Sequence, residues 1–179
     1  MAIPPADFFN IFSDEGVPDY SAIPTTQKDN FNNWITQNFL KFKTINSYDE
    51  VTPSEELYKE MVAKGYVHRG PQCHYTAKAL TLIDNRFDFF TGFVKRSDFI
   101  YPIITHSFNF FEGKLIDFTR YNFVNEYNTD YFPHTYYGMK IPIYFIEKYR
   151  KETIEEYSMN PLLIDWYKQL LFRLDDHDH

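Results

Sequence analysis

The segment 103–119 constrains the fold more than any other part of the chain. It reads IITHSFNFF, then EG, then KLIDFT, so two runs of strand-forming residues are separated only by Glu112 and Gly113. A two-residue connection between such runs predicts a tight β-hairpin, and the length of the connection fixes the register. The simplest register places Phe111 opposite Lys114. The sequence therefore predicts an antiparallel sheet built around this hairpin.

The predicted hairpin places an imidazole beside a carboxylate. His106 and Phe108 share one face, because side chains alternate along a strand with a period of two. In the same register Asp117 lies opposite Phe108, diagonal to His106. The Cα atoms of diagonal neighbours are roughly 7 to 8 Å apart, which side chains of this length can bridge. A slip of one residue would separate the two groups.

The only cysteine of the chain, Cys73, lies in the stretch RGPQCHYTAKAL. The apolar spacing after it predicts a helix from Cys73 to about Ile83. A thiol at a helix N-terminus lies at the positive end of the helix dipole, which favours the thiolate, and nearby N–H groups can stabilise an oxyanion. The residues then match three catalytic roles: Cys73 the nucleophile, His106 the general base and acid, and Asp117 the orienting carboxylate.

Each of the three residues also has a structural interpretation. A lone cysteine is usually a small buried hydrophobe. His106 could be a buried strand histidine whose hydrogen bond is satisfied by Asp117, and Asp117 could be an acid that flanks a turn. The order of the three residues along the chain favours the catalytic interpretation.

The rest of the chain is expected to complete one domain over residues 1–179, a length that supports a full hydrophobic core. Proline-punctuated residues 1–50 are interpreted as an N-terminal extension, with a helix within 25–42. A strand is expected near 89–95. The stretch 160–174 predicts a C-terminal amphipathic helix that is capped by Asn160.

Residues 52–65 carry the signals of a further helix. Thr52 and Glu55 have the spacing of a capping box, and Pro53 suits the first helical position. Gly65 suits the residue after the helix, where a left-handed backbone is common.

The aromatic segment 125–141 follows directly on the strand that bears Asp117. Pro133 and Pro142 are expected to break any long element in it. A tyrosine-rich loop can stack on a ligand and offer hydroxyl groups, so the segment predicts one wall of a substrate site. The alternative is that these rings cover the sheet. The predicted substrate-binding residues are Gln72, His134, Tyr136 and Tyr137.

Composition narrows the class of protein. The formal net charge of −7 argues against nucleic-acid binding, which needs a basic surface, and favours a neutral or cationic substrate. One cysteine cannot form an intrachain disulfide. The chain shows neither a leader pattern nor an apolar run of about 18 to 20 residues, so we expect a cytoplasmic protein without a membrane partner.

Four short motifs follow one another in chain order. They are Gly70-x-x-Cys73-x-x-x-Ala77, then Gly92-Phe93-Val94, then His106-Ser107-Phe108, and finally Asp117-Phe118-Thr119.

This order resembles the core of the transglutaminase-like branch of the papain-fold cysteine enzymes, whose motifs typically read Gly-x-Cys, Gly-Tyr, His-Ala-Trp and Asp-Pro-Thr. The resemblance covers residues 70–119. The stretch RGPQC is also similar to the Arg-Gly-Gly-x-Cys motif of arylamine N-acetyltransferases. Pro71 and Gln72 depart from these patterns, and the step from His106 to Asp117 is shorter than is usual in the family.

The resemblance implies an α+β, papain-like (transglutaminase-like) fold, with the nucleophile helix packed on an antiparallel sheet. It also implies acyl chemistry through a thioester, as in an amidase, a peptidase or an acyltransferase. The substrate would be a small-molecule or peptide amide or acyl compound, and neither a metal nor an organic cofactor would be required. The alternative is a non-catalytic module of the same fold that binds a peptide or another partner in an aromatic cleft.

Overall fold

The computed structural model describes residues 25–96, 103–120 and 132–177. The helices are α1 (Lys28–Asn38), α2 (Glu55–Ala63), α3 (Cys73–Ile83), α4 (Ile143–Ile146), α5 (Arg150–Glu156) and α6 (Leu163–His177). The strands are β1 (Leu40–Ile45), β2 (Phe87–Arg96), β3 (Ile103–Phe111), β4 (Lys114–Ile116) and β5 (His134–Ile141). Short 3-10 turns are η3 (Thr25–Gln27), η4 (Tyr48–Glu50), η5 (Phe118–Arg120) and η6 (Glu147–Tyr149).

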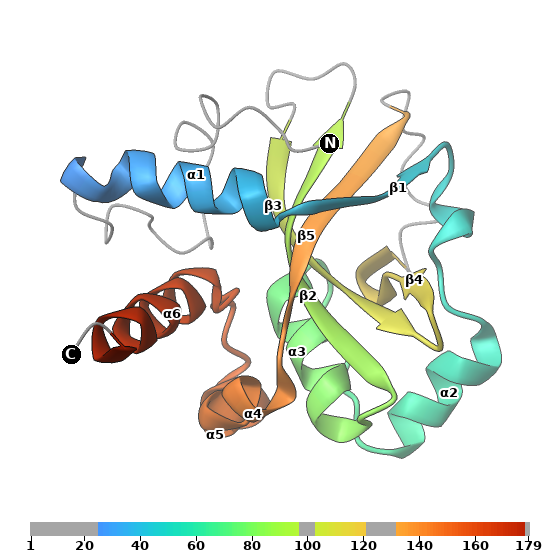
Figure 1. Cartoon of the computed structure of the whole chain (residues 1–179). Helices are drawn as coiled ribbons and strands as arrows, with labels where there is room; N and C mark the ends of the chain where they lie inside the picture. Colours follow the sequence, from blue (N-terminus) through green and yellow to red (C-terminus); the bar gives the residue numbers. More distant parts are fainter. Residues whose placement is uncertain (1–24, 97–102, 121–131, 178–179) are drawn as a thin grey trace.

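The five strands form one antiparallel sheet in the order β1-β5-β2-β3-β4, curled into a half-barrel (Figure 1). Helix α3 packs on β2 and β3 at the centre of the sheet. In Figure 1, α1 and α6 lie on one side of the molecule and α2 lies on the other, near β4. The expected α+β class is confirmed.

The predicted hairpin is confirmed in its register. Phe111 pairs with Lys114, and Asn109 pairs with Ile116. The connecting residues have positive φ values, 51° at Glu112 and 80° at Gly113, as a tight two-residue turn requires. The pairing of β4 with β3 ends at Ile116, so Asp117 follows the strand directly.

The two faces of the sheet carry different cores. On one face α1, α3 and α6 pack on the sheet. The core on this face includes Phe31, Ala77 and Tyr167 of the helices and Phe89 and Phe93 of β2. The other face lies inside the curl of the sheet and carries Ile45, Tyr48, Val51, Val94, Phe108, Leu115 and Tyr136. Because side chains alternate along β3, His106 and Phe108 belong to the inner face, whereas Ser107 and Asn109 point to α3.

The aromatic segment differs from the prediction. Residues 134–141 form β5, which lies between β1 and β2 in the sheet, and Pro133 and Pro142 flank this strand instead of breaking it. Residues 125–131 lie outside the described part.

The backbones of β5 and β2 approach closely where Gly138 pairs with Gly92. A Cβ atom on Gly92 would overlap the carbonyl oxygen of Tyr137.

The N-terminal part is also more integrated than expected. Residues 40–45 form β1, an edge strand of the sheet that pairs with β5. The interpretation of residues 1–50 as an extension is therefore wrong for this segment, whereas residues 1–24 lie outside the described part. The pairing partner of β1 is remote in sequence, which is why local patterns did not reveal the strand.

Two helix starts differ from the prediction by a few residues. The side chain of Ser54, not Thr52, caps α2 by accepting a hydrogen bond from the Leu57 N–H (3.1 Å). Thr52 instead donates its hydroxyl proton to the carbonyl of Tyr48 (2.7 Å). Helix α6 begins at Leu163, and Asn160 stabilises the turn before it by accepting the Leu162 N–H (2.9 Å).

Candidate active site

Cys73 is the first residue of α3, as the sequence predicts. Its side chain is buried, at 8% exposure. Its thiol interacts with the imidazole of His106, and the imidazole of His74 also lies near enough to lower the pKa of the thiol. The preceding residue, Gln72, makes no side-chain cap at the start of α3, so the first backbone N–H groups of the helix have no side-chain acceptor from that position.

His106 joins the thiol to a carboxylate. Its Nε2 atom lies 2.6 Å from Oδ2 of Asp117, and both side chains are almost fully buried. Since Nε2 is engaged by the carboxylate, Nδ1 is the ring nitrogen that remains for the sulfur of Cys73. The structure thus brings the three predicted residues into one chain of contacts, in the order Cys73, His106, Asp117.

Asp117 is fixed by further hydrogen bonds. Tyr136 donates its hydroxyl proton to Oδ2 (2.8 Å), and the backbone N–H of Thr119 donates to Oδ1 (3.2 Å). The backbone N–H of Asp117 itself donates to the carbonyl of Val51 (2.7 Å). Hydrogen bonds to both oxygens hold the carboxylate in place beside the imidazole.

The end of β4 leaves room for Cys73 of the helical layer to approach His106 of the sheet. In the described ladder β4 pairs with β3 only as far as Asn109, so His106 lies beyond the paired stretch. Helix α3 contacts both β3 and η5, the turn that follows Asp117. The first residue of α3 therefore reaches the ring of His106 at this open edge of the sheet.

The electrostatics of the pair favour the charged forms. Burial alone would raise the pKa of the Cys73 thiol, but the imidazoles of His74 and His106 together hold it well below its ordinary value. Burial likewise disfavours a charged His106, yet Asp117 and the thiolate raise its pKa to about 9. A thiolate beside an imidazolium is the nucleophilic form of a cysteine.

A second buried imidazole, that of His74, lies near enough to the thiol to lower its pKa. Its Nδ1 atom lies 2.6 Å from the hydroxyl oxygen of Ser107, and both residues are buried. The Ser107 hydroxyl in turn donates to Thr91 Oγ1 (3.3 Å). From the sequence, His74 is interpreted as a structural residue or a rim contact, because neighbouring positions of a helix do not face each other; its bond to Ser107 depends on how α3 lies on β3.

The predicted substrate-binding residues do not form one wall. Tyr136 is completely buried on the face of His106, where its hydroxyl binds Asp117. Tyr137 points to the opposite face and stacks on Phe93, with ring centroids 5.4 Å apart. The expectation that the two tyrosines line one surface is wrong, because neighbouring residues of a strand point to opposite faces.

The other two predicted substrate-binding residues lie at the start of an element. His134 is the first residue of β5; it is buried and stacks on Phe132, with ring centroids 4.3 Å apart. Gln72 directly precedes Cys73, and its buried Oε1 atom has no hydrogen-bond partner among the described residues. Gln72 is thus the one predicted substrate-binding residue that keeps an unused polar atom next to the nucleophile in sequence.

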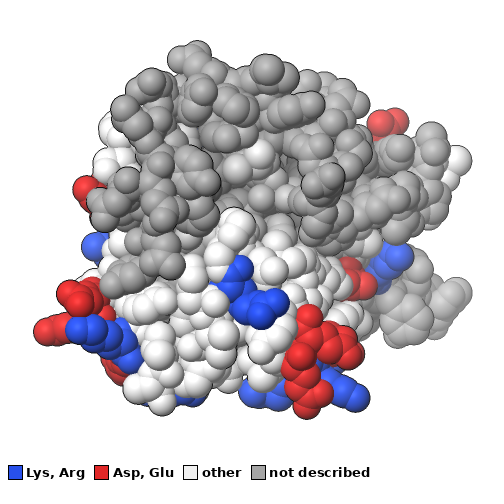
Figure 2. All heavy atoms as spheres, turned by 180° about the vertical axis from the view of Figure 1, so that it is seen from behind, with Lys and Arg blue, Asp and Glu red and all other residues white. Residues whose placement is uncertain are grey.

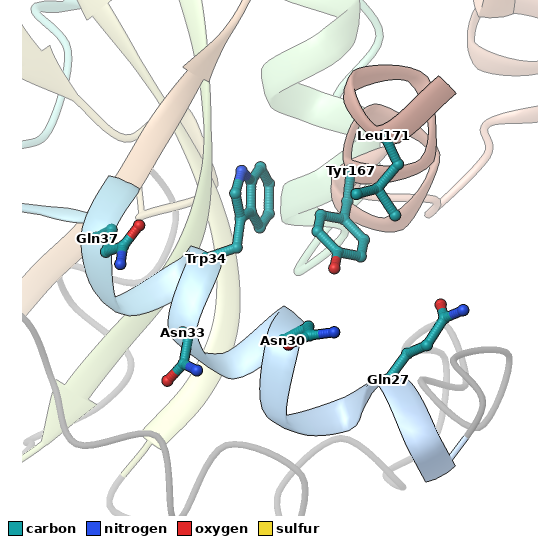
Figure 3. A pocket seen from close by; sticks show the side chains of 7 residues that line it. All are labelled: Gln27, Asn30, Asn33, Trp34, Gln37, Tyr167 and Leu171. Atoms are coloured by element: carbon teal, nitrogen blue, oxygen red, sulfur yellow. The ribbon is translucent and has the colours of Figure 1, made fainter. Parts of the chain in front are cut away.

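A separate groove lies between α1 and α6 (Figure 3). It has a volume of about 460 Å³ and contains neither Cys73, His106 nor Asp117 among its lining residues. In Figure 3 the ring of Trp34 points from α1 toward Tyr167 of α6. The lining residues are Gln27, Asn30, Asn33, Trp34, Gln37, Tyr167 and Leu171.

Two other features have no counterpart in the described part of the chain. Among residues 25–96, 103–120 and 132–177 no group of three or more histidine, cysteine or acidic side chains is arranged to hold a metal ion. None of the helices in the described part combines the length and the apolar character that a membrane crossing needs. On the face shown in Figure 2, basic and acidic side chains of the described residues are interspersed.

Comparisons with protein-family models, with curated proteins and with solved structures found no match to the chain.

Proposed function

We propose that the protein performs thiol-dependent acyl chemistry through a Cys73–His106–Asp117 triad. One observation carries this proposal: the buried ring of His106 is bonded to Asp117 through Nε2 and interacts with the Cys73 thiol on its other side. A structural histidine needs a partner for its polar atoms, but it does not need a thiol at a helix N-terminus as the second partner. The arrangement is the one that activates a nucleophile.

The chemistry would proceed in two steps. The Cys73 thiolate attacks the carbonyl carbon of an amide or ester and forms a thioester, while the bond to the leaving group breaks. The proton of the His106 imidazolium moves to the departing nitrogen or oxygen. Water or an amine then attacks the thioester, His106 removes its proton, and the thiolate is restored. Backbone N–H groups at the start of α3 would stabilise the oxyanion of both steps.

We further infer a papain-like fold of the transglutaminase-like type. The support is the order of parts along the chain: a nucleophile at the start of α3, a histidine on β3 and a carboxylate directly after β4. Every step uses side chains and backbone groups of the chain together with the substrate and water or an amine, so the proposal requires no cofactor. Hydrolysis and acyl transfer share the thioester and differ only in the second nucleophile.

The proposal is tested with p-nitrophenyl acetate, a small activated acyl donor. We expect a burst of p-nitrophenol and an acetyl group on Cys73, detected by intact mass and peptide mapping. Cys73→Ala should remove both signals and leave the melting temperature nearly unchanged, because one small buried side chain replaces another. If wild type and Cys73→Ala release p-nitrophenol at equal rates and no adduct forms, the protein is better described as a binding module.

A further inference from the structure

The groove between α1 and α6 differs in composition from the rest of the chain. Charged residues make up 24% of the sequence, yet the residues that line the groove are four carboxamides, two aromatic residues and one leucine. Its volume of about 460 Å³ is in the range typical of small-molecule sites. A charged ligand would lose its hydration there without meeting an opposite charge. The lining therefore suits a neutral, polar ligand.

The four carboxamides come from η3 and α1; they are Gln27, Asn30, Asn33 and Gln37. All four side chains are exposed, and none has a hydrogen-bond partner among the described residues. Asparagine is a weak helix former, so helix stability does not account for Asn30 and Asn33 on α1. Each carboxamide offers N–H donors and an acceptor oxygen, which are therefore available to a ligand.

The aromatic residues give the groove a fixed apolar wall. The partly buried ring of Trp34 stacks on Phe31, with ring centroids 5.9 Å apart, and lies 4.8 Å from the ring of Tyr167. Phe31 and Tyr167 are themselves buried. In Figure 3, Trp34 points toward Tyr167, and the side chain of Gln27 points from α1 toward α6. Because these contacts hold the indole in place, a ligand would not have to order it on binding.

We propose that this groove binds a neutral saccharide, with a pyranose ring packed against Trp34 and hydroxyl groups bonded to Gln27 and Asn30. A pyranose presents a C–H face that packs on an aromatic ring, and its hydroxyl groups both donate and accept hydrogen bonds. A helical peptide would instead need a stripe of apolar anchors, and Leu171 is the one aliphatic side chain in the lining. No residue of the triad lines the groove, so this inference does not depend on the proposed function.

The experiment uses the full chain, whose two tryptophans, Trp34 and Trp166, give two indole N–H signals in NMR spectra. Trp34→Phe identifies which signal is which. Cellotriose and fully N-acetylated chitotriose serve as neutral probes, and we expect each to shift the Trp34 signal saturably at millimolar concentration. The signal of Trp166, which does not line the groove, should move little. Chitotriose without acetyl groups carries ammonium groups and should bind at least about 10-fold more weakly.

Variants of exposed residues test the contacts without disturbing the core. Gln27→Ala and Asn30→Ala should each weaken binding by about 3- to 10-fold, because each removes one hydrogen-bonding side chain. Asn38→Ala is the matched control: this carboxamide lies on the same helix, outside the groove, and donates to the carbonyl of Trp34 (2.8 Å). Asn38→Ala and Cys73→Ala should both bind the probes as wild type does.

Three results would overturn the inference. The first is a Trp34 signal that neither neutral trisaccharide shifts saturably. The second is an equal affinity of wild type and the double variant Gln27→Ala/Asn30→Ala. The third is an equal shift with N-acetyl-triglycine amide, which would assign the groove to peptide backbones instead. The triad is judged separately, since release of p-nitrophenol by the same protein does not depend on this groove.

Discussion

The two ends of helix α3 both hold a potential anion, but they do so in different ways. At the N-terminal end two buried imidazoles, those of His74 and His106, lower the pKa of the Cys73 thiol. At the C-terminal end Asp84 binds Lys64 (2.7 Å) and Arg86 (2.7 Å), whose side chains are 43% and 40% exposed. At the N-terminal end the pKa of the Cys73 thiol is lowered and that of His106 is raised. At the C-terminal end a carboxylate meets a lysine and an arginine, which are all charged near neutral pH.

The helix dipole explains the difference. The N-terminus favours an anion, so the thiolate of Cys73 needs only a modest set of partners. The C-terminus disfavours a carboxylate, and Asp84 is tolerated there because two cations reach it; hydrogen bonds from Arg86 come first among the causes that hold the pKa of Asp84 well below its usual range. The N-terminal end is thus arranged for reactivity, whereas the C-terminal end ties α3 to α2 and β2.

The largest effect should come from breaking the N-terminal end at Asp117. Asp117→Asn keeps the size of the side chain but removes the charge that raises the pKa of His106 to about 9 against the effect of burial. The ring should then titrate at lower pH, which NMR of the imidazole can follow. We expect the burst rate with p-nitrophenyl acetate to fall by about 10³-fold or more. A fully active Asp117→Asn would assign the third role of the triad to another residue.

The next effect concerns the middle of the helix, between the two ends. Lys78 is fully buried, and its Nζ atom has no hydrogen-bond partner among the described residues. Burial lowers its pKa from 10.5 to about 7, against the attraction of Asp165 and Glu152. A lysine whose folded pKa is depressed lowers stability below that pKa, and the cost disappears above its unfolded pKa of 10.5.

Lys78→Met should therefore stabilise the protein. We expect the free energy of unfolding to rise by about 2 to 4 kcal/mol below pH 7, with the gain shrinking as the pH approaches 10.5. Urea denaturation over this pH range measures the difference. A loss of stability at every pH would mean that the ammonium group is paired in solution.

Breaking the C-terminal end should cost less. Asp84→Asn should lower the free energy of unfolding by about 1 to 2 kcal/mol at neutral pH, because its cationic partners are partly exposed to solvent. The folded pKa of Asp84 is depressed, so its contribution is present above the unfolded value of 3.8 and is lost as the pH falls below it. The difference between variant and wild type should shrink over that acidic range.

The same variant sharpens the comparison of the two ends. The thiol pKa of Cys73, measured from the ultraviolet absorbance of the thiolate, should be identical in Asp84→Asn and in wild type, since neither Asp84 nor its cations are among the groups that shift it. A thiol pKa that moves with Asp84 would show that the two ends of α3 are coupled through the helix.

The parts of the molecule that were predictable are those built from local contacts. The register of the hairpin follows from a two-residue turn, and α3 has the predicted bounds because its first turn and its apolar spacing are encoded within a dozen residues. Together they bring Cys73 to His106 and Asp117. The register of β3 and β4, continued by one residue beyond Ile116, was sufficient to predict that Asp117 lies near His106.

The missed parts depend on contacts between remote segments. β5 reads as a loop because its tyrosines and flanking prolines resemble a turn region, and only its pairing with β1 and β2 makes it a strand. The bond between His74 and Ser107 joins α3 to β3 on the face of the strand that points away from His106. No spacing along the chain signals such a bond, since it depends on how the helix lies across the sheet.

The smallest effect should come from the outermost group of the triad, the hydroxyl of Tyr136. Tyr136→Phe removes one of the hydrogen bonds to Asp117 and leaves the bond from His106 to the same oxygen in place. The loss of one such bond corresponds to about 1 kcal/mol, so we expect the burst rate to fall by about 3- to 10-fold. Tyr137→Phe is the matched control, because its ring stacks on Phe93 on the other face. Equal rates for the two variants would show that Asp117 is held without Tyr136, by its backbone contacts to Thr119 and Val51.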